Sequence, residues 1–447
     1  MVDNDRRRRF IRNSAVLAST PVAITLAGCT GGDGGDGGDG GDGGDGGNGG
    51  DGGDGGDGGD GGDGGTPTMS MPSEITVPGL YDISGATSDV GRPTAIGSRD
   101  AITWINENDP IDADIAHDWV DYAYEVPQAK QSFDGFTSGE APPIIIGWGT
   151  ADTEALSAQV AELEIVYISA SYSANLLEPE APYNFFGNLD YTSQARVHLK
   201  WIAENDPGAK VSFIFSNNPF GKAPVEGGKL YAEELDLTVG PDIDLPLTAN
   251  SATTQVRKAQ DNDVDYLIHQ NTAAPMQVLL RDKNDVYPEL TVCGLTYTVD
   301  ELRVQQSPDV FEGARYVNAF KLFDSAWNGD GLGSQIITDS FEREGRSADN
   351  VEVANLNYVR GVIHALLAMR GIENTIAAGN DPTEGANIRQ GMFDISGDDM
   401  GGLSQPYDYQ EGDRRPTMTG RTFEVVDGEL SFDTTIDLPR REDWIGL

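Results

Sequence analysis

The chain contains 447 residues, and its 30 lysines and arginines against 73 aspartates and glutamates give a formal net charge of −43 at neutral pH. A surface of this sign repels nucleic acid and anionic lipid, which excludes nucleic acid as a partner. The four histidines are far apart in the sequence and no Cys-x-x-Cys pair occurs, so we expect neither a metal site nor a cofactor.

The first 28 residues have the order of parts of an export signal. Arginines occupy positions 6–9, Phe-Ile follows them, and residues 13–26 form a short stretch rich in Ala, Ser and Thr. That stretch is too short to span a bilayer, which needs about 20 apolar residues. With Leu-Ala-Gly before Cys29, the segment resembles a twin-arginine lipoprotein signal. The resemblance implies that residues 1–28 are removed and that Cys29 carries a lipid at the extracellular face of the cytoplasmic membrane. Cys293 then has no partner, so we expect no disulfide.

A Gly-Gly-Asp repeat fills residues 31–65, interrupted once by Asn48. Nothing in it can bury apolar surface, so we expect residues 29–73 to be a disordered linker behind the lipidated cysteine. A calcium-binding β-helix also uses glycine-aspartate repeats, but each of its turns needs an apolar residue for the core. This tract has none, which favours the linker.

Acidic residues are spread through the rest of the chain, while lysines number only eight. Removing residues 1–28 takes away five arginines and two aspartates and moves the formal charge from −43 to −46. Dispersed acidity with scarce lysine resembles the proteins of salt-loving archaea, in which salt screens the repulsion between like charges.

After residue 73 the pattern changes to short apolar runs that alternate with amphipathic segments. The runs predict buried parallel strands at 75–80, 144–146, 165–168, 211–215, 266–268 and 290–293. Helical faces are predicted at Ala101, Ile102 and Ile105 and again at Ala195, Leu199 and Ile202, and both helices end in Glu-Asn-Asp-Pro. Alternation over this length indicates an α/β fold with two lobes.

Several motifs in this region carry a resemblance to a known family. They are Ser-Gly-Ala-Thr-Ser-Asp-Val-Gly at 84–91, the Ser-Tyr-Ser loop at 171–173, Asn-Pro-Phe-Gly at 218–221, Phe-Glu-Gly-Ala at 311–314, and Asp-Arg at 413–414 before a hairpin at 422–432. In this order and spacing, residues 74–447 resemble the branched-chain amino acid binding proteins of ABC transporters, which have the type I periplasmic-binding fold.

The resemblance implies two lobes, each a mainly parallel sheet flanked by helices, joined by a hinge of three segments. Lobe one would hold residues 74–188 and 318–400, and lobe two would hold 189–317 and 401–447. Ligands in open parallel sheets lie beyond the carboxyl ends of the strands. The loops after Ile146, Ile168, Phe215, Ile268 and Cys293 are therefore the candidates for the binding site.

Carried over by position, Thr150, Ser171 and Ser173 fall where the family binds a ligand carboxylate through hydroxyls and backbone N–H groups. Thr150 also suits a helix cap, and the two roles are compatible. Trp148 and Tyr172 are either aromatic walls of the site or core residues, and Phe220 takes the place of a family tyrosine that closes from lobe two.

The chain also departs from the amino-acid binders. Thr296 stands where they place an acidic residue for the ligand's ammonium, and Val90 stands where an aromatic residue is usual. A buried ammonium without a carboxylate partner is costly. Either Asp300, Glu301 or Asp89 substitutes, or the ligand is not an α-amino acid. Gln270 is a further candidate, as a hydrogen-bond partner for an amide or carboxylate, whereas the neighbouring His269 is expected to be structural.

These residues predict a monomeric, surface-anchored solute-binding lipoprotein that delivers a small polar organic ligand to ABC permease subunits. A ligand-presenting sensor for a chemotaxis or signalling receptor is the alternative. No nucleophile elbow, phosphate-binding loop or His-Glu-x-x-His motif occurs, so we do not expect an enzyme.

Overall fold

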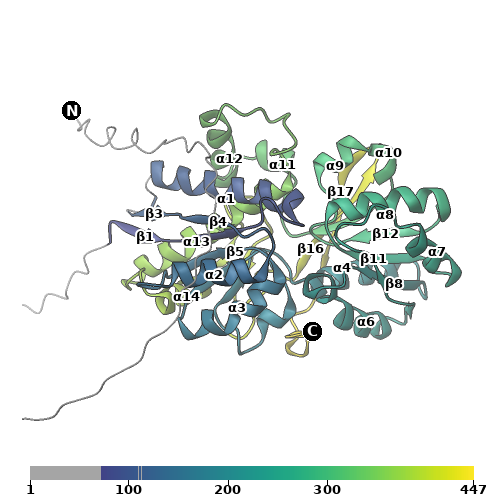
Figure 1. Cartoon of the computed structure of the whole chain (residues 1–447), viewed down its shortest axis with the longest axis horizontal. Helices are drawn as coiled ribbons and strands as arrows, with labels where there is room; N and C mark the ends of the chain where they lie inside the picture. Colours follow the sequence, from purple (N-terminus) through teal and green to yellow (C-terminus); the bar gives the residue numbers. More distant parts are fainter. Residues whose placement is uncertain (1–71, 109, 112) are drawn as a thin grey trace, which may run out of the picture. The chain divides into compact units, whose positions relative to one another are not determined.

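The structure is a computed structural model that describes residues 72–108, 110–111 and 113–447 (Figure 1). The predicted signal peptide, Cys29 and the Gly-Gly-Asp linker lie outside the described residues. No helix in the described part is long and apolar enough to cross a membrane. Cys293 is buried and has no disulfide partner among the same residues.

Lobe one is built on a five-stranded parallel sheet. Its strands, in spatial order, are β4 (Trp119–Asp121), β2 (Gly79–Tyr81), β5 (Ile144–Gly147), β6 (Val166–Ser169) and β7 (Asn184–Phe186). Every residue of β5 and β6 is buried, as expected for parallel strands covered on both faces. The apolar runs at 144–146 and 165–168 are thus confirmed as strands.

The predicted single strand at 75–80 is wrong, because the structure divides it in two. Its first part, β1 (Glu74–Thr76), pairs with β3 (Asp114–Ala116) in a separate small sheet, and only β2 joins the main sheet. Pro78 lies between the two strands. Proline has no N–H to donate to a ladder, so one strand cannot continue through it in the middle of a sheet.

The helices of lobe one come from two distant parts of the chain. The first part supplies α1 (Ser88–Asn108), α2 (Val126–Phe136) and α3 (Thr150–Glu162), and the second supplies α11 (Phe323–Trp327), α12 (Leu332–Arg343), α13 (Leu356–Ala377) and α14 (Gly385–Phe393). Helices α1 and α13 pack closely along each other. A Cβ atom at Gly97 would lie 2.1 Å from the carbonyl oxygen of Tyr358, so glycine is required for this approach.

Lobe two is built on a larger sheet. Its spatial order is β10 (Ile243–Asp244), β8 (Lys210–Phe215), β11 (Tyr266–Gln270), β12 (Thr291–Gly294), β13 (Arg315–Asn318), β16 (Thr419–Val426) and β17 (Glu429–Asp437), with β9 (Thr238–Val239) beside β8. The strands are parallel up to β13, and the last two form an antiparallel hairpin. The predicted runs at 211–215, 266–268 and 290–293 and the hairpin at 422–432 are confirmed.

The helices of lobe two follow the strands along the chain and cover the sheet, as Figure 1 shows for α7 and α8 beside β8, β11 and β12. They are α4 (Tyr191–Asn205), α5 (Pro219–Lys222), α6 (Val225–Glu234), α7 (Thr253–Asp261), α8 (Ala273–Val286), α9 (Glu301–Gln306) and α10 (Pro308–Phe311). Both helix ends predicted at Glu-Asn-Asp-Pro are confirmed, since α1 ends at Asn108 and α4 ends at Asn205. The predicted α/β architecture with two mainly parallel sheets is confirmed.

The chain passes between the lobes after β7, after β13 and after β15 (Tyr407–Asp408), which pairs with β14 (Ser396–Asp398). Hydrogen bonds tie the crossings together. Asn188 donates to Asn318 Oδ1 at 2.7 Å, which joins the first two crossings. Tyr407 donates its hydroxyl to the carbonyl of Gly187, which joins the third crossing to the first.

Thr296 of lobe two and Arg360, on α13 of lobe one, complete this arrangement. Asn188 also donates to Thr296 Oγ1 at 2.9 Å, and the guanidinium of Arg360 donates to the carbonyl oxygen of Thr296 at 3.0 Å. We call Asn188, Thr296, Asn318 and Arg360 the hinge cluster; all four are buried. A buried polar group is costly unless it is hydrogen-bonded, so these bonds fix the position of the crossings.

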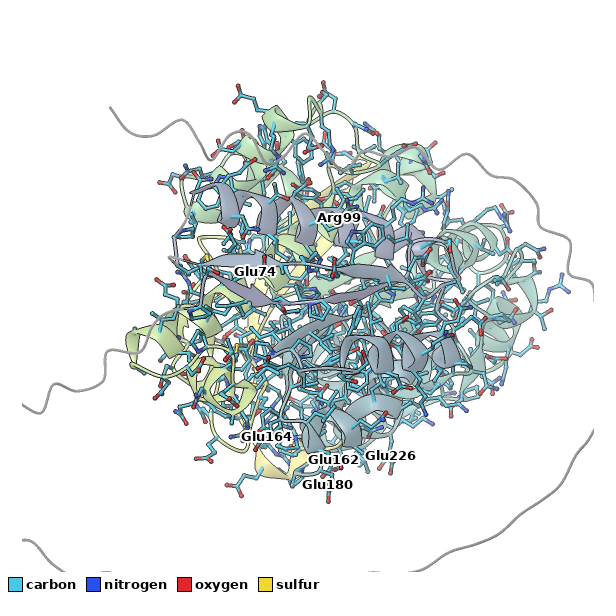
Figure 2. All side chains as sticks on the ribbon, turned by 60° about the vertical axis from the view of Figure 1, so that its left-hand side comes forward. Glu74, Arg99, Glu162, Glu164, Glu180 and Glu226 are labelled. Carbon is cyan, nitrogen blue, oxygen red and sulfur yellow. The ribbon has the colours of Figure 1, made fainter. Side chains whose placement is uncertain are left out.

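The acidic surface is visible in the side-chain view. Glu162, Glu164, Glu180 and Glu226 project into solvent at the lower side of Figure 2. Arg99, also labelled there, lies with its guanidinium carbon 4.4 Å from the ring centroid of Trp119. This cation–π contact partly covers a tryptophan at the edge of lobe one.

Candidate functional site

A pocket with about 250 Å³ of empty space lies between the carboxyl ends of the two sheets. Lobe one lines it with residues from the ends of β2, β4, β5 and β6, and lobe two with residues that follow β7, β8, β11 and β12. The lining residues are Thr87, Val90, Tyr124, Trp148, Gly149, Thr150, Ala170, Tyr191, Phe220, Thr272 and Tyr297. All five loops predicted from strand ends therefore contribute to one pocket.

The wall from lobe one is centred on the start of α3. Gly149 caps this helix, and a Cβ atom there would lie 2.3 Å from Asp152 Oδ1 and 2.6 Å from the hydroxyl of Tyr122, so only glycine fits. Thr150 is the first helical residue. The N–H groups of the first turn have no partners within the helix, and with the helix dipole they favour a negatively charged group.

The orientation of Trp148 is fixed by a chain of hydrogen bonds. Its indole Nε1 donates to Thr87 Oγ1 at 2.8 Å, and Thr87 donates in turn to Asp82 Oδ2 at 2.7 Å. Asp82 also accepts hydrogen bonds from the backbone N–H groups of Gly85 and Thr87. The loop after β2 thus holds the tryptophan ring at the pocket.

Tyr124 enters the pocket from a strained backbone. Strand β4 ends at Asp121, and Tyr122 follows it. The next two residues, Ala123 and Tyr124, have φ angles of 52° and 60°. This left-handed region is disfavoured for residues other than glycine, and two consecutive cases cost about 1–3 kcal/mol each. The surrounding structure supports this conformation, and the result is an aromatic ring in the lining.

The wall from lobe two is an aromatic cluster. The ring centroid of Phe220 lies 5.6 Å from that of Tyr191 and 5.9 Å from that of Tyr297, both in edge-to-face geometry. Tyr297 also meets Trp148 of lobe one at 5.8 Å. The hydroxyls of Tyr297 and Tyr191 both donate to the carbonyl oxygen of Ala170 in lobe one. The two lobes therefore touch around the pocket.

The predicted binding residues occupy three kinds of position. Trp148, Thr150 and Phe220 line the pocket. Ser171, Tyr172 and Gln270 lie directly behind the lining. Ser171 Oγ donates to Thr150 Oγ1 at 2.9 Å, Tyr172 stacks on Tyr297 with centroids 6.1 Å apart, and Gln270 donates to the carbonyl of Phe220 at 3.0 Å. The ligand roles of all these residues stay predictions.

Ser173 and Thr296 lie apart from the lining. Ser173 Oγ donates to Glu154 Oε1 at 2.7 Å, and Thr296 belongs to the hinge cluster, although its neighbour Tyr297 lines the pocket. Consecutive residues here serve two different regions, and no sequence pattern distinguished them.

Three carboxylates were candidates to replace the acidic residue that the amino-acid binders have at the position of Thr296. Each of them accepts hydrogen bonds from backbone N–H groups. Asp89 accepts from Ala274 at the start of α8 at 3.3 Å, and Asp300 caps α9 through Arg303. Glu301 accepts from Phe323 and Leu356, at the starts of α11 and α13, at 2.8 Å each. Burial raises the pKa of Asp89 and Glu301, and that of Asp300 to about 7. None of the three lines the pocket.

His269 is fully buried, and neither ring nitrogen has a hydrogen-bond partner among the described residues. Burial lowers its pKa to about 3, so the ring is neutral. It does not line the pocket. Within the described ranges, no group of three or more His, Cys, Asp or Glu residues is arranged to hold a metal ion.

Sequence reasoning did not single out Thr87, Tyr124, Gly149, Ala170, Tyr191, Thr272 or Tyr297 as binding residues. Most of them had a usable signal, because they directly follow predicted strands. Tyr124 had none, since β4 is a three-residue strand without a fully buried residue. Its place in the lining depends on the left-handed backbone that precedes α2.

Known proteins resemble the chain in both sequence and structure. A family model described as periplasmic binding protein matches residues 74–429. A search of curated proteins finds no significant match. A substrate-binding protein of an ABC transporter from Aeropyrum pernix is 28% identical, with a TM-score of 0.75 over 84% of this chain and 98% of that one.

Two further solved structures are complexes with a ligand. A branched-chain amino acid ABC transporter protein from Thermus thermophilus with bound valine is 22% identical, with a TM-score of 0.76 over 83% of this chain and 98% of that one. A solute-binding protein from R. palustris in complex with benzoate is 14% identical, with a TM-score of 0.69 over 84% and 99%. At these identities the likeness is one of fold.

Proposed function

Since the chain belongs to the periplasmic binding protein family, as a non-enzymatic solute-binding component of an ABC transporter, we propose that it captures a small polar organic ligand between its lobes and delivers it to permease subunits. An amino acid or a related amide or carboxylate is the class of ligand that suits the pocket. Proteins of the same fold are described with bound valine and with benzoate, which are compact molecules that carry a carboxylate.

The observation that carries this proposal is the pocket itself. It lies at the carboxyl ends of two parallel sheets, where strand ends and helix starts present unpaired backbone groups. Its walls come from both lobes, and the hydroxyl of Tyr297 in lobe two reaches the carbonyl of Ala170 in lobe one. A ligand here contacts both lobes, so its binding favours the closed arrangement.

Closure supplies the link between binding and transport. A ligand shifts a conformational equilibrium only through its different affinity for the two states. In this proposal the difference arises from Phe220 and Tyr297 of lobe two, which line the pocket opposite the residues of lobe one. The closed form is then the one that docks productively on the permease.

We further propose that the protein is exported by the twin-arginine route and held at the extracellular face of the membrane by a lipid on Cys29. The support is the order of basic residues, short apolar stretch, small residues and cysteine at the N-terminus. In the Cys29→Ser variant, the protein should bind ligand normally but leave the membrane fraction. Retention of the variant in membranes after a high-salt wash would contradict the anchor.

Ligand binding is tested by thermal unfolding of the full chain in molar salt, with amino acids, amides, urea and organic acids added singly. A ligand present at 100 times its dissociation constant stabilises the folded form by about 2.7 kcal/mol, which raises the melting temperature. If no compound of these classes shifts the transition, the proposed ligand class is wrong.

A further inference from the structure

We infer that the pocket selects an organic acid that has a compact apolar body and no ammonium group. This inference rests on the proposed function, because it names the substrate class of the same site. It follows from a mismatch in the lining: hydrogen-bond donors for a carboxylate are free, whereas no carboxylate among the described residues lines the pocket to pair with an ammonium.

None of the described residues that line the pocket has an acidic side chain. The carboxylates behind the lining have other partners. Asp82 accepts from Gly85 N, Thr87 N and Thr87 Oγ1. Asp152 accepts from the hydroxyl of Tyr122 at 2.9 Å behind Gly149, and burial raises its pKa to about 7. An ammonium buried against this wall would lack a charged partner, which is costly.

Other acceptors are engaged as well. The carbonyl oxygen of Ala170 receives two hydroxyls, from Tyr297 and from Tyr191. Thr87 Oγ1 receives the indole N–H of Trp148 and donates its own proton to Asp82. An ammonium carries three donors. It would have to displace these bonds to find acceptors here.

Donors, in contrast, remain available from both lobes. Thr150 Oγ1 accepts a hydrogen bond from Ser171, so its own proton is free to be donated into the pocket. The first-turn N–H groups of α3, a 13-residue helix, begin at the same residue. From lobe two, Thr272 lines the pocket and is 1% exposed. Its Oγ1 lies near the carboxylate of Asp89 but has no hydrogen-bond partner among the described residues.

A buried cation adds to this preference. The guanidinium carbon of Arg360 lies 4.2 Å from the ring centroid of Tyr297, whose ring lines the pocket. Arg360 is fully buried, and no described carboxylate lies within ion-pair distance of it. A charge in a low-dielectric interior acts over a longer distance than one in water. The positive charge of Arg360, which also acts on the buried carboxylate of Glu301, therefore contributes to a preference for an anion over a cation at the pocket.

The rest of the lining determines the body of the ligand. Trp148, Phe220, Tyr297 and Val90 supply apolar and aromatic surface around about 250 Å³ of space. A short branched chain or a single aromatic ring can contact these side chains from both lobes at once.

The test compares matched pairs of ligands that differ only in the ammonium group. The full chain in molar salt is titrated by calorimetry with 3-methylbutanoate and L-valine, 4-methylpentanoate and L-leucine, and 3-phenylpropanoate and L-phenylalanine. In at least one pair we expect the ammonium-free acid to bind tenfold more tightly or better. We also expect the acid to bind more tightly than its neutral amide, with 3-methylbutanamide as the probe.

The outcomes separate this inference from the proposed function. If the amino acid of each pair binds as tightly as the acid, the inference is wrong and the proposed function stands. Equal affinity for the acid and the amide would also overturn the inference, because the inference requires a negatively charged ligand. If acids, amino acids and amides all fail to bind, both the inference and the proposed ligand class fail.

Substitution of the donor gives an independent check. Thr150→Val keeps the shape but removes the hydroxyl, so affinity for the acid should fall roughly tenfold to a hundredfold, as for a charge-assisted hydrogen bond. The affinity for the neutral amide should fall by a smaller factor. Thr103→Val, at an exposed position on α1, is the matched control and should change neither affinity. Unchanged affinity for the acid in Thr150→Val would overturn the assignment of the donor.

Discussion

Thr296 and Tyr297 are neighbours in the chain, but they belong to two buried regions with opposite properties. Thr296 lies in the hinge cluster, where Asn188, Arg360 and the hydroxyl of Tyr316 all donate hydrogen bonds to it. Tyr297 lines the pocket, where the hydroxyls of Thr150 and Thr272 retain unused hydrogen-bonding capacity. The hinge cluster bonds its four members to one another, although Asn318 Nδ2 and Arg360 Nε have no partner among the described residues, whereas the pocket leaves hydroxyls in its lining for a ligand.

This difference separates structural roles from functional ones. Hydrogen bonds within a buried polar network rigidify a fold, so the bonds among the members of the hinge cluster determine how the crossings are held. Unsatisfied buried groups cost free energy until a partner arrives, so the pocket gains that energy back on binding. Changes in the hinge cluster should therefore act on stability, and changes in the pocket on affinity.

The largest effect is expected for Asn188→Ala in the hinge cluster. Asn188 bonds Thr296, Asn318 and the backbone N–H groups of Leu189 and Ala319. Losing these bonds and leaving buried partners unpaired should lower the free energy of unfolding by roughly 3–4 kcal/mol. Denaturant unfolding measures this, with Asn205→Ala on the surface of α4 as the control. An effect no larger than the control's would show that the cluster does not hold the crossings.

The next effect concerns pH and Asp300, three residues after Tyr297. Its pKa of about 7 in the folded protein lies above the ordinary value, so the folded form binds an extra proton between about pH 4 and 7. The stability that this proton contributes is present below that window and is lost as the pH rises through 7. Between pH 5 and 8 the loss should be on the order of 2 kcal/mol.

Asp300→Asn tests this directly, because asparagine also caps helices but does not ionise. The variant should lose less stability than the parent between pH 5 and 8, measured by urea unfolding in molar salt. Asp285→Asn, at an exposed position on α8, should follow the parent curve. Parallel curves for the parent and Asp300→Asn would mean that Asp300 does not titrate in this range.

A smaller effect, and one on affinity, is expected for Phe220→Ala in the pocket. Phe220 packs edge-to-face on Tyr191 and Tyr297 and lines the pocket from lobe two. Truncation removes apolar contact with the ligand and with the opposite wall, so affinity should fall roughly tenfold to thirtyfold. Phe432→Ala, at a 51% exposed position on β17, should leave affinity unchanged. Calorimetry that finds equal affinities for the two variants would move the site elsewhere.

The smallest effect distinguishes two serines of one loop. Ser171 bonds the hydroxyl of Thr150 in the lining, whereas Ser173 bonds Glu154. Ser171→Ala should weaken binding about threefold to tenfold, as for one neutral hydrogen bond, and Ser173→Ala should change it less than twofold. A greater loss in Ser173→Ala would favour the role in carboxylate binding that family position implies for it.

The sequence determined the strands at 144–146, 165–168, 211–215, 266–268 and 290–293, the two Glu-Asn-Asp-Pro helix ends and the strand-end loops that form the pocket, because these depend on local periodicity and on proline and capping residues. The family resemblance supplied Trp148, Thr150 and Phe220, which line the pocket. Only the tertiary structure decided which side of the backbone each residue faces, as at Thr296 and Tyr297. It also brought Tyr124, Thr272 and Arg360 to the pocket and its surroundings, from positions up to 236 residues apart. Such contacts depend on packing between segments that no local pattern specifies, so they could not be predicted from the sequence.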